Sequence, residues 1–135
     1  MDPRFLLDTN ICVYIARKKP EKVLRHFGEI SMGEAAISVI TYGELIYGAT
    51  KSSRREASLE ALREFVRLVP AVPMPEKAGD VYGFIRADLE ARGQTISAND
   101  LWIAAHALAA KLTLVTNNEK EFRRVRGLKI QNWAT

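Results

Sequence analysis

Residues 97–118 read SANDLWIAAHALAAKLTLVTNN, and this stretch decides the fold prediction because a helix pattern runs directly into a strand pattern. The segment LWIAAHALAA, at 101–110, is apolar nearly all round, which is typical of a helix buried in the core. The TLVT run at 113–116 has the length and composition of a buried strand. A buried helix that leads straight into a buried strand predicts an α/β fold, in which helices cover the sheet.

The same alternation of short apolar runs with longer helical patterns continues along the chain. Strands are predicted over 5–7, 35–40, 68–72, 113–116 and 128–131. Helices are predicted over 10–17, 21–27, 42–50, 54–67, 76–91 and 98–111, with a short one near 120–126. This order predicts a single domain over residues 1–135 with a mainly parallel central sheet and helices on both faces.

Composition and charge narrow the class of protein. With 135 residues, 47% of them hydrophobic, the chain can bury a proper core without disulfide or metal staples. Its single cysteine, Cys12, excludes a disulfide framework and a cysteine-rich zinc site, and it fits a cytoplasmic location. No stretch approaches the roughly 20 apolar residues of a membrane span, so no membrane association is expected. The net charge of +4 suits a polyanion such as nucleic acid, among other partners.

Four polar residues follow strands or open helices in the predicted order of elements. Asp8 ends the first strand, and Glu44 lies near the start of the helix after the second. Asp100 opens the apolar helix, and Asn118 follows the next strand. In right-handed crossovers the carboxyl ends of the strands and the amino ends of the helices share one edge of the sheet, where ligands bind. The sequence therefore predicts that all four side chains converge at this edge.

Each of these residues also has a purely structural interpretation. Glu44 stands three residues after Thr41, which is the spacing of a helix capping box. Asp100 stands three residues after Ser97 in the same pattern. Asp8 begins the turn-forming triplet Asp-Thr-Asn, and it can cap the helix that follows. A carboxylate at a helix start is favoured by the helix dipole, so capping and ligand binding need not exclude each other.

Three carboxylates at one place point to a bound cation. Their mutual repulsion raises their pKa values unless a positive charge is present, and oxygen ligands suit Mg²⁺ or Mn²⁺ rather than zinc.

The two histidines make a poor acid/base pair. His106 lies six residues after Asp100, about 120° away round the helix, and we expect it in the core or at an interface. Cys12, in an apolar helix, is most simply a packing residue.

Basic residues gather in three runs, over 17–25, 51–55 and 120–126. A solvated helix face explains each run. Because the last run follows Asn118 and Lys51 lies beyond Glu44, basic residues at the rim of an acidic centre also suit cleavage of a phosphodiester backbone. The candidate RNA contacts are Lys51, Lys120, Arg123 and Arg124.

Four sequence blocks together resemble a known family. They are LLDTN at 6–10, ISVITYGELIYGA at 37–49, ISANDLWIAAHAL at 96–108 and LVTNNEKEF at 114–122, and the likeness extends to RGLKIQNW at 126–133. In this order and spacing they resemble the PIN-domain ribonuclease toxins, in the VapC branch of type II toxin–antitoxin systems. The resemblance implies a three-layer α/β/α domain, usually a homodimer, which cuts RNA with Mg²⁺ or Mn²⁺ and leaves a 5′-phosphate and a 3′-hydroxyl.

The resemblance also implies roles for particular residues. Asp8, Glu44 and Asp100 carry over as the catalytic acids and metal ligands. Asn118 stands at a fourth position that is often Asp in the wider family, so Glu119 or Glu121 is left to supply the missing charge. Relatives are held inactive by a small VapB antitoxin whose C-terminal arm covers the active site, in a heterotetramer or larger complex. Several relatives cut transfer RNA.

The sequence therefore supports a cytoplasmic, metal-dependent endoribonuclease toxin. Asp8 and Asp100 are the expected direct metal ligands, Glu44 a ligand or an orienting residue, and Asn118 a group that positions a water or a second metal. The rival hypothesis is a non-catalytic RNA-binding or scaffold module whose acids only cap helices. These motifs leave open which RNA is the target and how many metals bind.

Overall fold

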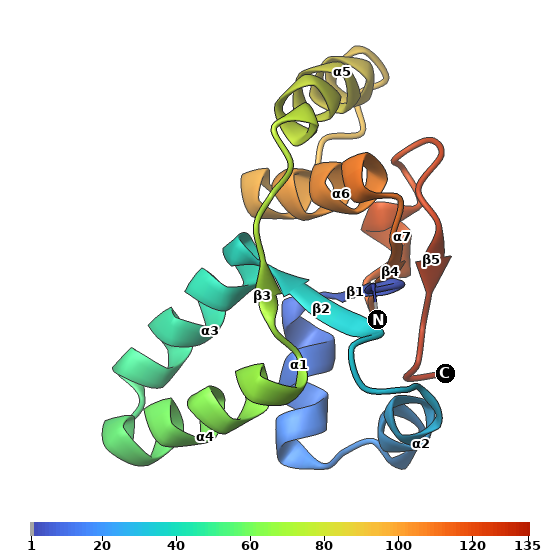
Figure 1. Ribbon diagram of the computed structural model, residues 1–135. Helices are drawn as coiled ribbons and strands as arrows, with labels where there is room; N and C mark the ends of the chain where they lie inside the picture. Colours follow the sequence, from blue (N-terminus) through green and yellow to red (C-terminus); the bar gives the residue numbers. More distant parts are fainter. Residues whose placement is uncertain (1) are drawn as a thin grey trace.

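The structure, a computed structural model, describes residues 2–135, which form five strands and seven helices (Figure 1). In chain order they are β1 (Phe5–Leu7), α1 (Thr9–Arg17), α2 (Glu21–Glu29), β2 (Ala35–Ser38), α3 (Val39–Lys51), α4 (Arg55–Leu68), β3 (Ala71–Val72), α5 (Lys77–Ala91), α6 (Ala98–Ala110), β4 (Thr113–Val115), α7 (Glu119–Phe122) and β5 (Ile130–Gln131). The predicted α/β fold is confirmed.

All five strands are parallel and lie in the order β3-β2-β1-β4-β5. β1 is central, with Leu6 level with Ala36 of β2 on one side and with Leu114 of β4 on the other. The chain adds β2 and β3 in one direction from β1, and β4 then joins on the opposite side. Parallel α/β sheets open a ligand crevice where the strand order reverses in this way, at the carboxyl ends of the strands.

Alternate side chains of the short strands enter two hydrophobic cores, one on each face of the sheet. On one face Phe5 and Leu7 pack with buried residues of α1, such as Ile11, and with Trp133 near the chain's end. On the other face Leu6 packs with the buried residues of α6 and with parts of α5 and α7. Figure 1 shows α1 and α2 below the sheet and α6 above it, with α5 stacked outside α6. The predicted three-layer arrangement is therefore present.

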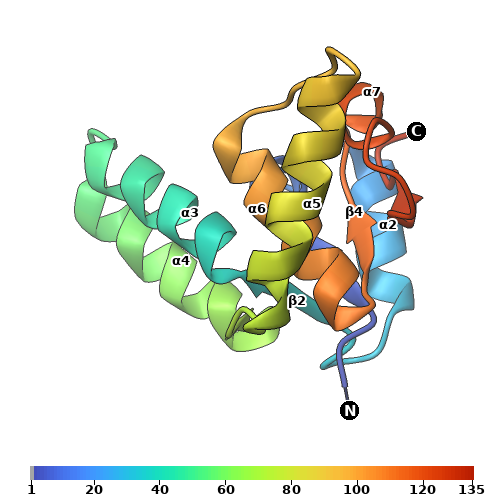
Figure 2. The same ribbon diagram turned by 90° about the horizontal axis from the view of Figure 1, so that it is seen from above.

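Helices α3 and α4 pack against each other as a hairpin that projects away from the sheet. The view from above shows the same projection and places α5 across α6 (Figure 2). Because α3 begins directly after β2, its first turns stay at the carboxyl edge of the sheet while its far end extends outward.

Several predicted boundaries are wrong by a few residues. The strand predicted over 35–40 ends at Ser38, whose hydroxyl accepts a hydrogen bond from the Ile40 N–H at 3.2 Å and so starts α3 early. The strand predicted over 68–72 shrinks to β3, because α4 continues to Leu68. The predicted last helix and last strand are also shorter, since α7 and β5 have four and two residues.

Within residues 2–135, none of the helices combines the length and the apolar character that crossing a membrane requires.

Candidate active site

Asp8 follows β1 directly and is buried at the carboxyl edge of the sheet. Its Oδ1 accepts the backbone N–H of Ile11 at 3.0 Å, which caps α1, and its Oδ2 accepts the hydroxyl of Thr116. Burial raises the pKa of Asp8, and the hydrogen bonds from Thr116 and Ile11 oppose part of that rise. The capping interpretation is therefore correct, and the same side chain also carries a buried acid to this edge.

Thr116 connects the ends of β1 and β4 at the point where the strand order reverses. Its fully buried hydroxyl donates to Asp8 and accepts the backbone N–H of Asn118 at 2.9 Å. From the sequence, Thr116 was predicted only to be the last residue of a strand. The sequence does contain a signal for its contact with Asp8, because a hydroxyl residue ends the strand just before the polar pair Asn117-Asn118.

Glu44 lies in the second turn of α3, and its carboxylate is held by two other segments. The Thr9 hydroxyl donates to Oε1 at 2.6 Å, and the Asn99 side-chain amide approaches Oε2 at 3.4 Å. Thr41 does not cap this helix, because Ser38 starts α3 one turn earlier and Thr41 is buried inside it. The capping-box interpretation of Glu44 is therefore wrong, and its carboxylate does not cap the helix.

Asp100 lies in the first turn of α6. Its backbone N–H donates to the hydroxyl of the helix cap Ser97 at 3.3 Å, so the predicted helix start at Ser97 is confirmed. The pKa of the Asp100 carboxyl is raised to about 6, chiefly by burial and further by the negative charges of Glu121, Asp8 and Glu44, while a hydrogen bond with Ser97 opposes part of the rise. The pKa of Asp100 thus reports a shared acidic site.

In the segment after β4, the hydrogen bonds distinguish the two acids, Glu119 and Glu121, between which the sequence could not choose. The side-chain amide of Asn118 donates to Glu121 Oε2 at 3.1 Å, and the charge of Glu121 helps to raise the pKa of Asp100. Glu119 instead pairs with Arg123 at 2.5 Å and accepts from Asn132 at 2.9 Å, and these partners lower its pKa. Glu121 is therefore the acid that accompanies Asn118, and Glu119 belongs to a separate surface contact.

One open hollow of about 160 Å³ collects all four predicted site residues. It is lined by Asp8, Thr9, Asn10, Glu44, Asp100, Ile103, Asn118 and Phe122. These residues come from β1–α1, α3, α6 and the segment around α7, so four distant parts of the chain meet here. The predicted convergence at the strand ends is what the structure shows.

The chemistry of this lining suits a hard divalent cation. It offers carboxylate and amide oxygens, which Mg²⁺ and Mn²⁺ prefer, and the described lining residues include three acids but neither lysine nor arginine. Within residues 2–135, however, no three acidic, histidine or cysteine side chains lie close enough to coordinate one ion as they stand. Hydroxyl and amide donors occupy their oxygens instead. A cation bound here would have to replace neutral donors such as Thr9 and Thr116 at these oxygens.

The predicted RNA contacts lie outside this hollow. Lys51 ends α3, and Lys120 and Arg123 are exposed on or beside α7. Arg124 is only partly exposed, and its guanidinium donates to the backbone carbonyl of Thr95 at 2.9 Å. Arg124 is thus bonded within the fold, and the RNA-binding roles of all four side chains stay predictions.

Neither histidine lines the hollow. His106 is buried in α6, where burial lowers its pKa, and its Nδ1 has no hydrogen-bond partner within the described residues. His26 stacks on Trp133 with ring centroids 5.8 Å apart. Cys12 is buried in α1, and burial raises the pKa of its thiol, as fits a packing residue. Sequence reasoning missed three residues of the site, Thr9, Thr116 and Asn99, which are neutral hydrogen-bond donors to its acids.

Comparisons with known proteins agree with this geometry. Residues 5–128 match the family model described as PIN domain. The chain is 37% identical over 131 residues to Ribonuclease VapC2 of Haemophilus influenzae, covering 97% of this chain and 98% of the relative. It is 39% identical over 131 residues to the tRNA(fMet)-specific endonuclease VapC of Shigella flexneri, with the same coverage.

Solved structures give the same result. VapBC2 from Rickettsia felis bound to a DNA fragment from their promoter superposes with a TM-score of 0.89 at 39% identity, covering 96% of this chain and 98% of the other. DNA-bound VapBC from Salmonella typhimurium superposes with a TM-score of 0.90 at 37% identity, covering 97% and 98%. Fold, site and full-length similarity thus agree, and the chain belongs to the PIN-domain family, within its branch of VapC ribonuclease toxins.

Proposed function

We propose that this protein is the toxin of a type II toxin–antitoxin pair and cleaves RNA as a Mg²⁺- or Mn²⁺-dependent endonuclease. The observation that carries the proposal is the hollow at the strand ends, where Asp8, Glu44 and Asp100 meet from three separate elements. One domain and a cytoplasmic location, where RNA is available, remain part of the proposal.

The chain's own residues hold and orient the acids of this site. Asp8 and Asp100 are the proposed direct ligands, and the hydrogen bonds of Asp8 to Ile11 and Thr116 fix its carboxylate against the sheet. Thr9 orients Glu44 as a further ligand or as an orienting group. When bound, the cation supplies Lewis-acid polarisation of the phosphate and of an attacking water.

Glu121 is the proposed fourth acid, with Asn118 as its positioning partner. The amide of Asn118 is anchored by its backbone bond to Thr116 and donates its side-chain N–H to Glu121. This contact supports a carboxylate at the position where the family pattern often has Asp. Because Glu119 is already paired with Arg123 and Asn132, it is the less suitable candidate.

The proposed substrate is RNA, and transfer RNA is the first RNA to test. The name of the Shigella flexneri relative, tRNA(fMet)-specific endonuclease, supports that choice. The exposed cations Lys51, Lys120 and Arg123 are proposed to hold the phosphate backbone beside the hollow.

The proposed protein partner is a VapB-like antitoxin, as in the VapBC complexes of the relatives. A largely apolar groove of about 590 Å³ runs between α1, α3 and α4, and two of its lining residues, Thr9 and Glu44, also line the hollow. A peptide arm lying in this groove reaches the acids directly. We propose that the antitoxin's C-terminal arm binds here and covers the site.

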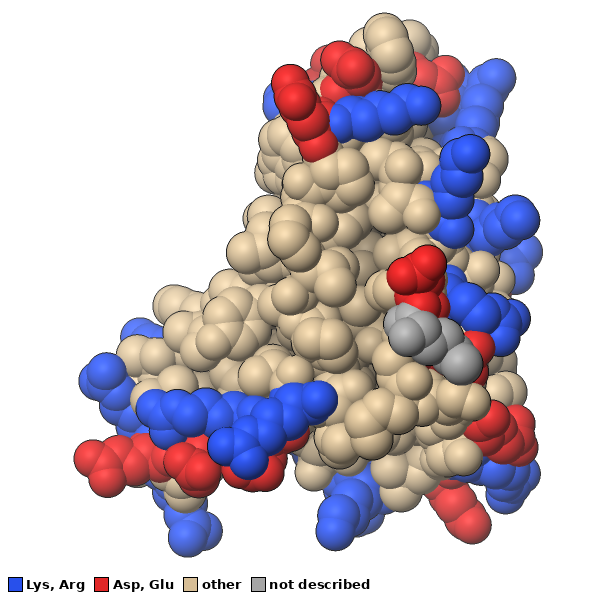
Figure 3. All heavy atoms as spheres, viewed as in Figure 1, with Lys and Arg blue, Asp and Glu red and all other residues tan. Residues whose placement is uncertain are grey.

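A homodimer is also proposed. The face over α3, β3, α5 and α6 carries few charged side chains, which gather instead over α4, at the outer end of α5 and along the right-hand side of the view (Figure 3). Exposed apolar side chains on these helices include Val39, Tyr47 and Phe84. The helical glycines Gly79 and Gly83 of α5 have nothing within 4 Å of where a Cβ would stand, so packing inside this chain does not require them. Both features support a face covered by a second copy.

The test is RNA cleavage by purified protein in EDTA and after metal is restored. Cleavage should stop in EDTA and return with Mg²⁺ or Mn²⁺. Asp8→Asn should fold normally, because asparagine caps a helix about as well as aspartate, yet it should lose cleavage by orders of magnitude. A host that expresses this variant without antitoxin should grow normally.

Thr113→Ser serves as the matched control, because Thr113 lies on β4 at the opposite end of the strand from the site. It should keep wild-type cleavage. Undiminished cleavage in chelator, or a folded Asp8→Asn protein with near wild-type cleavage, contradicts the proposal and favours the rival non-catalytic or metal-independent functions.

A further inference from the structure

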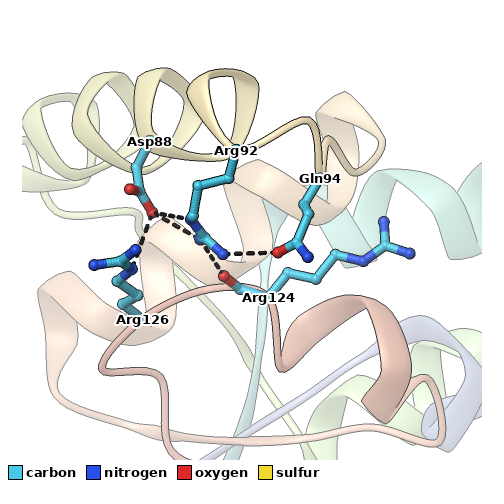
Figure 4. Close-up of polar contacts among 5 residues, drawn as sticks. All are labelled: Asp88, Arg92, Gln94, Arg124 and Arg126. Atoms are coloured by element: carbon cyan, nitrogen blue, oxygen red, sulfur yellow. Dashed lines mark hydrogen bonds and ion pairs between the residues drawn. The ribbon is translucent and has the colours of Figure 1, made fainter.

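Two arginines bond the loop between α5 and α6 to the segment that follows α7, one in each direction. Figure 4 shows the bond from Arg92 to the backbone carbonyl of Arg124. Arg92, directly after α5, donates from Nη2 to the backbone carbonyl of Arg124 at 2.6 Å. Arg124 in turn donates from Nη1 to the backbone carbonyl of Thr95 at 2.9 Å. We call this reciprocal pair, Arg92 and Arg124, the arginine clamp.

Arg92 is fixed before it reaches across. Its Nε and Nη2 donate to Asp88 Oδ2 at 3.1 and 2.7 Å, and its Nη1 donates to Gln94 Oε1 at 2.7 Å. Arg126 approaches the same Asp88 oxygen at 3.6 Å from the other segment. Every nitrogen of the Arg92 guanidinium therefore has a partner, a geometry that the planar fork of arginine allows and a lysine ammonium does not.

The two segments joined by the clamp are the two that bring Asp100 and Asn118 to the hollow. Thr95 lies two residues before Ser97, the cap of α6, and Asp100 follows in the first turn of that helix. Arg124 lies two residues after Phe122 of α7, which lines the hollow with Asn118. The clamp thus ties the start of α6 to the end of α7 from outside the hollow.

The loop needs such a restraint. Between α5 and α6, residues 92–97 form no regular hydrogen-bonded element, and Gly93 turns the chain with a φ of +66°. Carbonyls in such a loop otherwise bond to water, which leaves the loop free to open locally. The guanidinium of Arg124 replaces that water at the Thr95 carbonyl, and the guanidinium of Arg92 does the same at the Arg124 carbonyl in the other segment.

We propose that Arg92 and Arg124 are positioning residues, which set the separation between Asp100 and the Asn118–Glu121 pair so that the acids can hold a divalent cation. This inference rests on the proposed function. It also assigns Arg124 a role other than the RNA contact expected from its place in a basic run. The neighbouring residue Arg123 is a suitable comparison. It pairs with Glu119, four residues earlier in the same segment, and does not connect the two segments.

The test compares Arg124→Ala, Arg124→Lys and Arg123→Ala, and it measures thermal unfolding of the full chain as Mn²⁺ is titrated. Mutating a residue that hydrogen-bonds to a metal ligand typically changes metal affinity 10- to 100-fold, and the clamp, which reaches the ligands only through the backbone, belongs at the lower end of that range. Arg124→Ala should therefore need about 10-fold more Mn²⁺ for half of the full stabilisation, and Arg124→Lys, which keeps one donor, an intermediate amount. Arg123→Ala removes the same charge and should match the wild type in its Mn²⁺ requirement, although its RNA binding should weaken. Hydrogen exchange in EDTA should rise over residues 93–97 in Arg124→Ala only.

The RNA-contact alternative gives the opposite pattern. It expects both alanine variants to lower the salt slope of RNA binding alike, by about 0.7 to 0.9, with no change in the Mn²⁺ requirement. Equal Mn²⁺ titrations and equal exchange for all variants overturn the clamp while leaving the proposed function intact. A wild-type protein that Mn²⁺ does not stabilise refutes the proposed metal site and the inference with it. If Arg124→Ala does not fold, Arg124→Lys decides between the same outcomes.

Discussion

Replacing Asp100 by asparagine should stabilise the protein in the absence of metal. The pKa of the Asp100 carboxyl rises from 3.8 to about 6, first because of burial and then because of the charges of Glu121, Asp8 and Glu44. A pKa that is higher in the folded state means that ionising the group costs stability. This part of the stability is present in full below pH 3.8 and is lost as the pH rises through about 6. An asparagine amide never ionises, so the Asp100→Asn variant escapes that loss.

The size of the effect follows from the pKa change. A rise of about 2 in pKa corresponds to about 3 kcal/mol. Because Asp100 is partly exposed, solvent screening reduces this to about 1 kcal/mol. The hydroxyl of Ser97 still caps α6 in the variant, so no cap is lost. For a chain of this length, about 1 kcal/mol raises the midpoint of thermal unfolding by about 3–4 °C.

The assay is urea unfolding in EDTA from pH 4 to pH 8, followed by the same series with Mn²⁺. The variant should gain on the wild type as the pH rises in EDTA, and the order should reverse when Mn²⁺ is present. Asp88→Asn is the comparison in EDTA only, because Asp88 also holds Arg92 of the clamp. The pKa of Asp88 is lowered by its hydrogen bond to Arg92, so losing this carboxylate should reduce stability at neutral pH. Parallel pH curves for wild type and Asp100→Asn in EDTA refute the shared acidic site.

Three further predictions concern the acid pair, the groove and the uncharged face. Glu121→Gln should lower RNA cleavage at least 10-fold, whereas Glu119→Gln should cleave like the wild type; equal activities in a cleavage assay reject Glu121 as the fourth acid. Ala61→Glu places a charge in the groove between α1, α3 and α4 and should abolish binding of the antitoxin, measured by calorimetry, while cleavage is retained. Phe84→Glu should convert a dimer to a monomer in light scattering with little change in unfolding midpoint, because Phe84 is 76% exposed; an unchanged mass places the dimer contact elsewhere.

The convergence of the site was predictable from the sequence because it depends on topology alone. Once Asp8 ends a strand and Asp100 begins a helix in a parallel α/β fold, both must lie at one edge. Which of Glu119 and Glu121 faces the site depends partly on a side chain from another segment. Arg123 stands four residues after Glu119, a spacing that indicates an ion pair, but the second partner, Asn132, comes from beyond the helix and no local pattern indicates it.

The misplaced start of α3 has a physical reason. The run Ser-Val-Ile-Thr over 38–41 contains three β-branched residues in succession, which favour strands by propensity. In the structure the hydroxyl of Ser38 caps the helix, and tertiary packing overrides that preference. Thr41, which the sequence pattern predicts to be a helix cap, is instead buried within α3, and its hydroxyl has no hydrogen-bond partner within the described residues. The bond from Arg124 to the Thr95 carbonyl could not be predicted for a related reason, since its partner lies 29 residues away.

The bond from the Ile11 N–H to Asp8 has a consequence for inheritance. Both aspartate codons become asparagine codons through one G-to-A transition, and asparagine accepts the same N–H. A single nucleotide change can therefore disarm the proposed toxin without unfolding it, and the folded product still presents its groove to the antitoxin. When cells are selected for survival while they express this gene without an antitoxin, Asp8→Asn should recur among the clones that still make full-length protein. The inactive gene should persist as an intact reading frame, and one reversion would restore its activity.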